Sequence, residues 1–397
     1  MRNPKDILIS LSKHSNESTY QYLRLYRILF NEQMFYVAYQ RIYAKPGNMT
    51  SGTEGQTIDQ MTLQRIDAII EMLKDESYKP KPVRRVYIPK KNGKLRPLGV
   101  PTFDDKLVQE VVRMILEAIY EGYFEGTSHG FRPLRSCHTA LKHIRVEFTG
   151  TKWFIEGDIK GFFDNINHGV PVNILAQRIA DERFLRLIRK FLNAGYLEQW
   201  TYHNTYSGTP QGGIISPILA NIYLDTFDKY INEYALAFNR GVKRKYVREY
   251  RKLNSKVSYI RKKIYREVEE EKRDALITEY KTLRDELIRM PSGDPMDETY
   301  KRLRYARYAD DFLIGVAGSK ADCEKIKADI TQFMSERLKL ELSAEKTLIT
   351  NAQDKAKFLG YEIHARKSDV AMRNRKGVLS RNYNVSIQPL FWWFEIY

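Results

Sequence analysis

The stretch "YARYADDFLIGVAG" at residues 305–318 constrains the fold of this chain more than any other. Residues 305–308 and 312–316 are typical of two strands of a hydrophobic hairpin. Between them stand Asp310 and Asp311, adjacent carboxylates that raise each other's cost of ionisation. An Asp-Asp pair can be a solvated turn, because Asp favours turns through hydrogen bonds to its own backbone. The other interpretation is that divalent cations neutralise the pair.

Metal binding would explain two carboxylates at the tip of an apolar hairpin. Mg²⁺ prefers hard oxygen ligands, and neighbouring side chains of a strand point to opposite faces, so the two aspartates should have different roles. A third carboxylate is needed to hold two ions about 3.5–4 Å apart for in-line phosphoryl transfer. Asp158 ends the short apolar run "WFIEGD". A shared sheet would bring Asp158 beside Asp310.

The remaining chain is predicted to mix helices and strands. Residues 1–80 indicate helices broken by the polar stretch "KPGNMTSGTEGQTIDQM". Asn92 and Gly93 centre a hairpin signal in "VRRVYIPKKNGKLRPLGVP". A helix is predicted where apolar residues recur at helical spacing, at Leu107, Val111, Ile115 and Ile119. Another is predicted to begin at "SPILANIYL", with Ser216 as its cap and Pro217 in its first turn.

Residues 239–301 differ from the rest in their dense charge of both signs. Apolar and aromatic residues fall there at alternating steps of four and three, at Tyr246, Tyr250, Leu253, Val257, Ile260 and Ile264. This spacing predicts a long helix or helical hairpin, inserted before the Asp-Asp stretch. An autonomous coiled coil is disfavoured because so few heptads are present. The basic side of the insertion could contact nucleic acid or be a solvated face.

The charge of the chain indicates its class of partner. A formal net charge of +17 over 397 residues predicts a polyanionic partner, because neutralised phosphates release counterions. Nucleic acid is favoured over a membrane surface, since no apolar run approaches the ~18 residues of a spanning helix. Two isolated cysteines predict neither a disulfide framework nor a cysteine zinc site. With no signal-peptide core at the start, a cytoplasmic location is expected.

Four blocks of the chain closely resemble the reverse transcriptases encoded by group II introns, whose proteins also act as splicing maturases. In chain order they are "SHGFRPLRSCHTAL", "EGDIKGFFDNI", "GTPQGGIISPILANIYLDTFD" and "YADD". The resemblance runs from about residue 20 to 365. It implies an α+β fold, the fingers and palm of a right-hand polymerase. The palm would be a small antiparallel sheet flanked by helices, and the thumb would be largely absent.

The resemblance also implies a division of the chain into parts. These parts are an N-terminal helical extension of the fingers (1–80), fingers (81–150), a first part of the palm (151–238), the charged helical insertion (239–301), a second part of the palm with the Asp-Asp hairpin (302–365) and the start of a truncated thumb or maturase region (366–397).

The catalytic aspartates of the family map onto Asp158, Asp310 and Asp311. The resemblance implies that Asp158 and Asp310 bridge two Mg²⁺ ions, for which Mn²⁺ could substitute. Asp311 would be the weaker ligand, and Ile159 lies at the same metal position. One ion would lower the pKa of the primer 3′-hydroxyl, and the other would hold the triphosphate and the leaving pyrophosphate.

Phe163 corresponds to the aromatic residue with which the family excludes ribose. A phenyl ring offers no hydrogen bond to a 2′-hydroxyl and occupies its space, so deoxynucleotides should be preferred. The alternative is that Phe163 packs in the core.

Further contacts are implied by the resemblance alone. Nucleotide binding is expected at Lys90, Lys91, Arg96, Pro210, Gln211, Gly212 and Lys346. Lys346 could donate a proton to the departing pyrophosphate. Template contacts are expected at Arg84, Arg85, Gly52 and Gly55.

The function implied is Mg²⁺-dependent addition of dNTPs to a DNA primer on an RNA template. Binding of group II intron RNA would promote splicing and retrohoming, with target DNA contacted through missing regions and a homodimer possible. The alternative is a non-catalytic RNA-binding splicing cofactor fragment. A viral RNA-dependent RNA polymerase is disfavoured by Phe163, and by Ala309 where such enzymes usually carry glycine.

Overall fold

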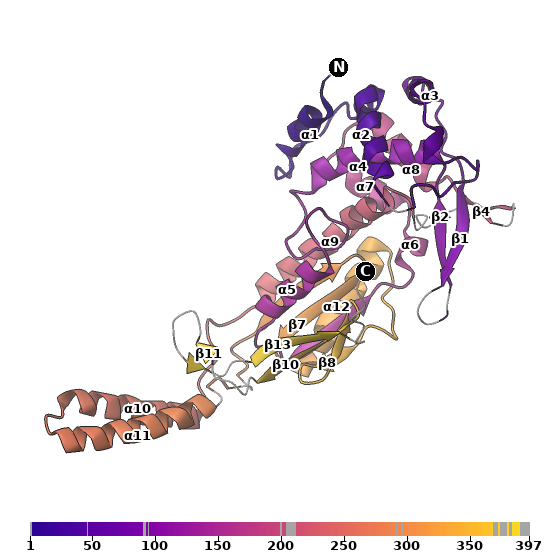
Figure 1. Cartoon of the computed structure of the whole chain (residues 1–397). Coiled ribbons are helices and arrows are strands. Elements are labelled where there is room, and N and C mark those ends of the chain that lie inside the picture. The colour runs from indigo at the N-terminus through magenta and orange to yellow at the C-terminus, as the bar shows by residue number, and fades with distance from the viewer. Residues whose placement is uncertain are drawn as a thin grey trace.

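The computed structural model describes the chain from residue 2 to 389 with gaps. The residues outside the description are 1, 46, 90–92, 94, 199–200, 204–211, 291, 295–296, 368–371, 374–378, 381–382 and 390–397. Figure 1 shows an elongated molecule, with the N-terminal helices and a β-hairpin at one end and a pair of long helices at the other. A sheet covered by helices lies between them.

The first end of the molecule is built around the helix α4 (Phe103–Tyr120). Leu107, Val111, Ile115 and Ile119 are fully buried along it, which confirms the helical spacing predicted for them. Thr102 begins the helix, because its hydroxyl accepts a hydrogen bond from the Asp105 amide. The other helical segments here are α1 (Pro4–Ser12), η1 (Tyr26–Phe30), α2 (Glu32–Tyr43), η2 (Ile58–Gln60), α3 (Leu63–Lys74), α7 (Gly169–Ala176) and α8 (Glu182–Leu192).

A four-stranded sheet lies beside these helices. Its order is β2 (Leu95–Val100), β1 (Val83–Pro89), β4 (Tyr196–Glu198) and β5 (Thr201–His203). β1 and β2 form an antiparallel hairpin, whereas β1 and β4 are parallel. The fold is therefore a mixture of helices and small sheets of mostly antiparallel strands.

The central sheet is antiparallel throughout. Its order is β6 (Arg302–Tyr308), β7 (Asp311–Ala317), β3 (Trp153–Asp158) and β8 (Ile349–Asn351). Successive side chains alternate between its two faces. Ile155 and Ile314 pack with the helices α9 (Ser216–Phe238) and α12 (Lys320–Leu338), whereas Phe154 and Leu313 pack with α5 (Cys137–Glu147). Helices and strands thus bury this sheet on both faces.

The register of β3 against β7 is fixed by close packing next to the end of β3. Gly157 lies opposite Phe312, whose ring occupies the space that a Cβ atom at residue 157 would need. The same register places Asp158 opposite Asp311. A shift by one residue would move every buried side chain to the wrong face.

The helix α9 joins the two halves of the molecule. Ile218 and Ile222 belong to the core of the N-terminal helices, whereas Tyr223 and Phe227 belong to the core of the central sheet. The helix begins at Ser216 itself, and Ile215 occupies the cap position predicted for Ser216.

Residues 239–301 contain a helical hairpin that projects from the body (Figure 1). Its helices are α10 (Arg248–Arg266) and α11 (Glu270–Arg289). Val257 and Ile260 are the buried residues of α10. Backbone bridges join Arg240 to Lys301 and Tyr246 to Gly293 at the base of the hairpin.

A further sheet consists of β9 (Ala356–Phe358), β10 (Tyr361–Lys367) and β13 (Tyr383–Pro389), accompanied by the short pair β11 (Met372–Arg373) and β12 (Leu379–Ser380). β10 continues across residue 366, where the sequence suggests a boundary, and Ile363 pairs with Ile387 of β13. The described part of 366–397 therefore extends this sheet. None of the described helices combines the length and apolar composition that crossing a membrane requires.

Candidate active site

The hairpin of β6 and β7 carries two of the three aspartates at its tip. Tyr308 pairs with Asp311, so Ala309 and Asp310 form the turn. Ala309 has a φ of 56°, a left-handed conformation that residues with a Cβ adopt at a cost. The adjacent loop presses on this turn, because a Cβ at Gly130 would clash with the Ala309 amide. The surrounding structure therefore holds the turn in place.

Asp158 meets the hairpin from the neighbouring strand. It lies opposite Asp311, and the two carboxyl groups share a hydrogen bond. Burial, followed by the charges of Asp310 and Asp158, raises the pKa of Asp311 to about 7. Burial, with the charge of Asp158 adding to it, also raises the pKa of Asp310. Three carboxyl groups thus share a half-buried neighbourhood with an excess of negative charge.

Lys346 is a cationic residue that forms a hydrogen bond with one of these carboxyl groups. Its Nζ donates to Asp158 Oδ2 over 2.9 Å, and this bond is the main reason that the pKa of Lys346 is raised. The Ser343 amide donates to the Asp158 carbonyl and holds the segment in place. The lysine side chain is 67% exposed, so it reaches the carboxylate from the solvent side.

Arg96 approaches the site from the other sheet. It lies on β2, and its positive charge lowers the pKa of Asp310 against the effect of burial. Arg96 of β2 is therefore near enough to Asp310 for its charge to act on that carboxyl group. Lys90 and Lys91, predicted at the tip of the hairpin of β1 and β2, lie outside the described residues.

The residues predicted to contact the template have partners within the chain. Arg84 donates two hydrogen bonds to the Ser51 carbonyl, at 3.1 and 2.7 Å. Arg85 stacks on Tyr196, with its guanidinium carbon 4.1 Å from the ring centroid. Gly52 approaches the Pro101 carbonyl so closely that a Cβ would lie 2.7 Å from its oxygen.

Gly55 has a φ of 73°, which glycine adopts without strain. Arg84 and Gly52 therefore join the segment around residue 52 to β1 and to the start of α4, whereas Arg85 joins β1 to β4.

The glycine-rich loop is described only from its last residues, and Pro210 and Gln211 lie outside the description. Gly212 has a φ of 112° and packs closely on β2, where a Cβ would lie 2.6 Å from the Gly99 carbonyl. Gln109 of α4 accepts hydrogen bonds from the amides of Ile214 and Ile215, the first at 2.8 Å. α4 and β2 thereby fix the end of this loop.

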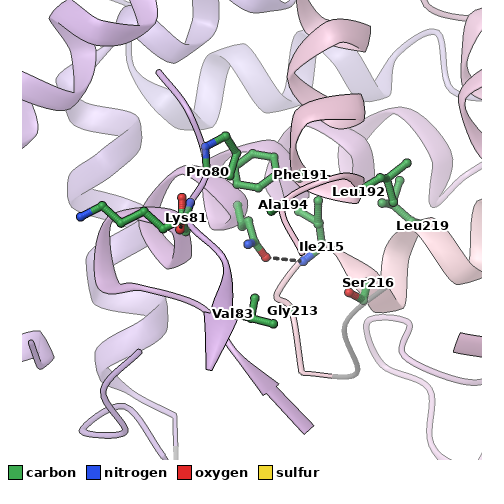
Figure 2. A pocket seen from close by; sticks show the side chains of 12 residues that line it. Pro80, Lys81, Val83, Phe191, Leu192, Ala194, Gly213, Ile215, Ser216 and Leu219 are labelled. Atoms are coloured by element: carbon green, nitrogen blue, oxygen red, sulfur yellow. Dashed lines mark hydrogen bonds between the residues drawn. The ribbon is translucent and has the colours of Figure 1, made fainter. Parts of the chain in front are cut away.

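Behind the loop lies a small cavity of about 20 Å³. Figure 2 shows it between the Pro80–Val83 segment, Phe191 of α8 and the start of α9. The dashed line in Figure 2 marks the hydrogen bond to the Ile215 amide. None of the three aspartates lines this cavity, so it is a packing gap behind the loop and holds no part of the carboxylate site.

Phe162 and Phe163 begin the short helix α6 (Phe162–Asn165), directly after the Asp158 segment. Phe162 is buried against Tyr223, whereas Phe163 is half-buried and contacts the same core from its edge. Phe163 thus has a face available to a ligand as well as core contacts. Ile159 has a buried side chain, so only its main chain could contribute to a metal site.

The carboxyl groups fit hard cations by their chemistry. Among the residues that the structure describes, no three His, Cys, Asp or Glu side chains are gathered as a ready-made metal site. Asp158, Asp310 and Asp311 nevertheless offer only oxygen donors, as Mg²⁺ prefers. Burial, followed by the charges of Asp310 and Asp158, raises the pKa of Asp311, and divalent cations would compensate the negative charge of the three carboxylates.

Comparison with known proteins identifies the family. Residues 88–253 and 281–363 match the reverse transcriptase (RNA-dependent DNA polymerase) family. The chain is also 48% identical, over 392 residues, to the group II intron-encoded protein LtrA of Lactococcus lactis subsp. cremoris. This chain belongs to the group II intron reverse transcriptase family. The alignment covers 98% of the chain and 65% of LtrA, so the chain spans about two-thirds of that relative.

Other relatives of this reverse transcriptase come from fungi and bacteria. The uncharacterized 91 kDa protein in the cob intron of Schizosaccharomyces pombe is 43% identical over 358 residues, covering 89% of the chain and 43% of that protein. Protein YkfC of Escherichia coli (strain K12) is 32% identical over 383 residues, covering 93% of the chain and 91% of YkfC.

Some residues that shape the site of this reverse transcriptase are not predicted by its motifs. Arg307 is fully buried beneath the turn formed by Ala309 and Asp310, and Asp228 of α9 binds it. The signal was the strand alternation, which places Arg307 on the same buried face as Tyr305. Gln109, which holds the end of the glycine-rich loop, gave no signal beyond its place on a helix.

Proposed function

We propose that this chain is an RNA-directed DNA polymerase that adds deoxynucleotides to a primer 3′-hydroxyl on an RNA template. The observation that carries the proposal is the pairing of Asp158 with Asp311 across β3 and β7, with Asp310 in the adjoining turn. In this assignment the central sheet with α9 and α12 is the palm. The hairpin of β1 and β2 and the N-terminal helices are the fingers.

Asp158 and Asp310 are assigned as the main ligands of two Mg²⁺ ions, and Asp311 as the weaker one, with Mn²⁺ as a substitute. When bound, such ions activate the primer hydroxyl and neutralise charge on the triphosphate. Asp311 would add a further negative charge that attracts the bound ions, whereas without ions this charge is disfavoured by its carboxylate neighbours. Holding three carboxylates in rigid strands gives the preorganisation that phosphoryl transfer requires.

Lys346 and Arg96 are assigned to the triphosphate. Lys346 is held at Asp158 and its raised pKa keeps it protonated at neutral pH, as a proton donor to the leaving pyrophosphate must be. Arg96 on β2 can form paired hydrogen bonds to phosphate oxygens. Lys90 and Lys91 from the same hairpin, and Pro210, Gln211 and Gly212 from the glycine-rich loop, complete the proposed nucleotide site.

Primer extension with Mg²⁺ on a primed RNA template tests the proposal. Asp310→Asn should lower the rate at least 100-fold, because it removes a charge from the metal site while keeping the size of the side chain. Asp354→Asn is the matched control, since Asp354 is exposed in the turn between β8 and β9. Extension by Asp310→Asn within a few-fold of the parent would refute the assignment.

A second candidate function is favoured by the charge of the chain. A net charge of +17 supports binding of group II intron RNA, which would make the chain a splicing cofactor with or without polymerisation. Binding of structured intron RNA without any dNTP incorporation would favour this function over the first. A combination of both activities would support the proposed role in splicing and retrohoming.

A further inference from the structure

The helix α10 is strongly basic. Of its 19 residues eight are basic and one, Glu249, is acidic, which gives the helix a net charge of +7. Its basic residues are Arg248, Arg251, Lys252, Lys256, Arg261, Lys262, Lys263 and Arg266. The partner helix α11 has six acidic and five basic residues over 20 positions, a net charge of −1. The basic excess is therefore a property of α10 and not of the hairpin as a whole.

The basic side chains of α10 form few ion pairs with the described residues of the chain. All eight basic side chains are exposed. Within the described residues, Lys256 is the member of this set that forms an ion pair, at 3.7 Å to Glu279 of α11. Val257 and Ile260 are the buried residues of α10, and α10 packs against α11, so the exposed basic residues are not needed to hold the hairpin together.

The basic residues of α10 also destabilise the helix. Arg248 and Lys252, Lys252 and Lys256, and Lys262 and Arg266 are like-charged pairs four residues apart, and such pairs repel each other on a helix. A sequence selected only for solubility would mix the two signs, as α11 does. The cost is understandable if an anionic partner covers α10.

We propose that α10 binds the phosphate backbone of double-helical RNA. This rests on the proposed function only in naming RNA as the nucleic acid. A helix of 19 residues is about 28 Å long, and α10 carries basic residues from its first position to its last, which suits a long, rigid and negatively charged rod. Exposed Tyr259 and Tyr265 add hydroxyl groups that can donate to phosphate oxygens.

The position of the hairpin makes this a contact separate from the catalytic site. Figure 1 shows α10 and α11 at the end of the molecule opposite the hairpin of β1 and β2. The bridge between Tyr246 and Gly293 joins the two legs of the helical hairpin at its base, and a hydrogen bond from Arg244 to the Gly150 carbonyl ties this base to the body. An RNA helix bound to α10 would therefore be held at a fixed place relative to the polymerase.

The test compares two sets of charge removals on one hairpin. The α10 variant carries Arg251→Gln, Lys252→Gln, Lys262→Gln and Lys263→Gln. The α11 control carries Lys272→Gln, Arg273→Gln, Lys281→Gln and Arg284→Gln, all at exposed positions. Both lose four positive charges, and Gln has nearly the helix propensity of Lys and Arg. Circular dichroism checks that both hairpins remain helical.

Binding of the full chain to a 20-base-pair RNA hairpin is measured in EDTA over a range of KCl concentrations. We expect the α10 variant to bind at least tenfold more weakly, and the slope of log affinity against log salt to fall by roughly three, since each lost phosphate contact removes somewhat less than one. The α11 control should stay within twofold of the parent. Because the assay contains neither Mg²⁺ nor dNTPs, its outcome does not depend on polymerase activity.

Three results would overturn the proposal. The first is unchanged RNA binding by the α10 variant, and the second is an equal loss in the α11 control, which would reveal a general charge effect. The third is an equal loss of affinity for a DNA duplex or for single-stranded oligo(U) of the same phosphate number, which would show that α10 does not distinguish an RNA helix.

Discussion

Arg307 and Asp228 form an ion pair, and both side chains are completely removed from solvent. Arg307 lies three residues before Asp310, the aspartate in the turn. Arg307 donates from Nε to Asp228 Oδ1 at 2.7 Å and from Nη2 to Oδ2 at 2.5 Å. The Tyr305 hydroxyl also donates to Asp228, at 2.7 Å. The pair ties strand β6 to helix α9 beneath the proposed catalytic site.

The remaining N–H groups of Arg307 reach the turn at Ala309 and the loop beside it. Nη1 donates to the Ala309 carbonyl at 2.9 Å and to Asn221 at 3.2 Å, and Nη2 donates to Ser128 at 2.8 Å. All five N–H donors of the guanidinium thus have acceptors. One buried group thereby fixes the left-handed Ala309 in position, and with it the orientation of Asp310.

Asp228→Asn is expected to destabilise the protein strongly. The substitution leaves the Arg307 charge buried without its counter-ion, and breaking such a pair costs about 3–5 kcal/mol. Denaturation in urea measures the loss in free energy of unfolding. Glu233→Gln is the control, since it removes a negative charge from the exposed side of the same helix. A loss below about 1 kcal/mol, or an equal loss in the control, would contradict the importance of the pair.

The strands and the meeting of the aspartates follow from local patterns in the sequence. Apolar residues bounded by turn signals mark β3 and the hairpin of β6 and β7, and Asp158 and Asp311 each stand at one end of such a run. Burial of the two strands in one sheet then leaves few ways to arrange them. The roles of the aspartates as metal ligands stay predictions, which primer extension by the Asp310→Asn variant tests.

Other features depend on contacts that no local pattern encodes. The parallel pairing of β1 with β4 joins segments far apart in the chain. The pairing of β13 with β10 follows a stretch of sequence without a clear hydrophobic period. Strand alternation places Arg307 on the face of Tyr305, but a basic residue in a strand usually faces solvent, and the burial of Arg307 depends on Asp228, 79 residues away. The contact of Lys346 with Asp158 spans 188 residues.

Replacing Phe163 should weaken discrimination against ribonucleotides. Phe163→Val shortens the half-buried ring that is proposed to occupy the space of a 2′-hydroxyl. The ratio of kcat/KM for dNTP over rNTP should fall about 10–100-fold, which is the range that steric changes of this size produce. Incorporation of dNTPs by the same variant is the internal control. An unchanged ratio would place Phe163 in the core alone.

Lys346→Met should lower kcat much more than it raises KM for the nucleotide. The substitution removes the ammonium group that lies 2.9 Å from Asp158, and loss of a general acid costs about 100-fold or more in rate. Single-turnover incorporation at saturating dNTP measures the effect. Lys325→Met, at an exposed position on α12, controls for the loss of a positive charge. A pure KM effect would show that Lys346 binds the triphosphate without transferring a proton.

Asp105 should make the stability of the protein depend on pH. It is buried and accepts hydrogen bonds from Tyr78 at 2.5 Å and Thr102 at 2.6 Å. Burial outweighs these bonds and raises the pKa of Asp105 from 3.8 to about 6. Between these two values the folded protein binds more protons than the unfolded chain, so its stability should fall as the pH rises from about 4 to about 6.

The expected decrease from Asp105 is about 3 kcal/mol, since each unit of pKa difference corresponds to about 1.4 kcal/mol. Urea denaturation at several pH values between 4 and 7 measures it. The side chain of Asp105→Asn cannot titrate. The free energy of unfolding of this variant should therefore lack the decrease of about 3 kcal/mol that the parent shows over this pH interval. Asp354→Asn removes an exposed carboxyl group and should keep the pH dependence of the parent. Parallel curves for the parent and Asp105→Asn would mean that the buried carboxyl group titrates at the same pH in the folded and unfolded chains.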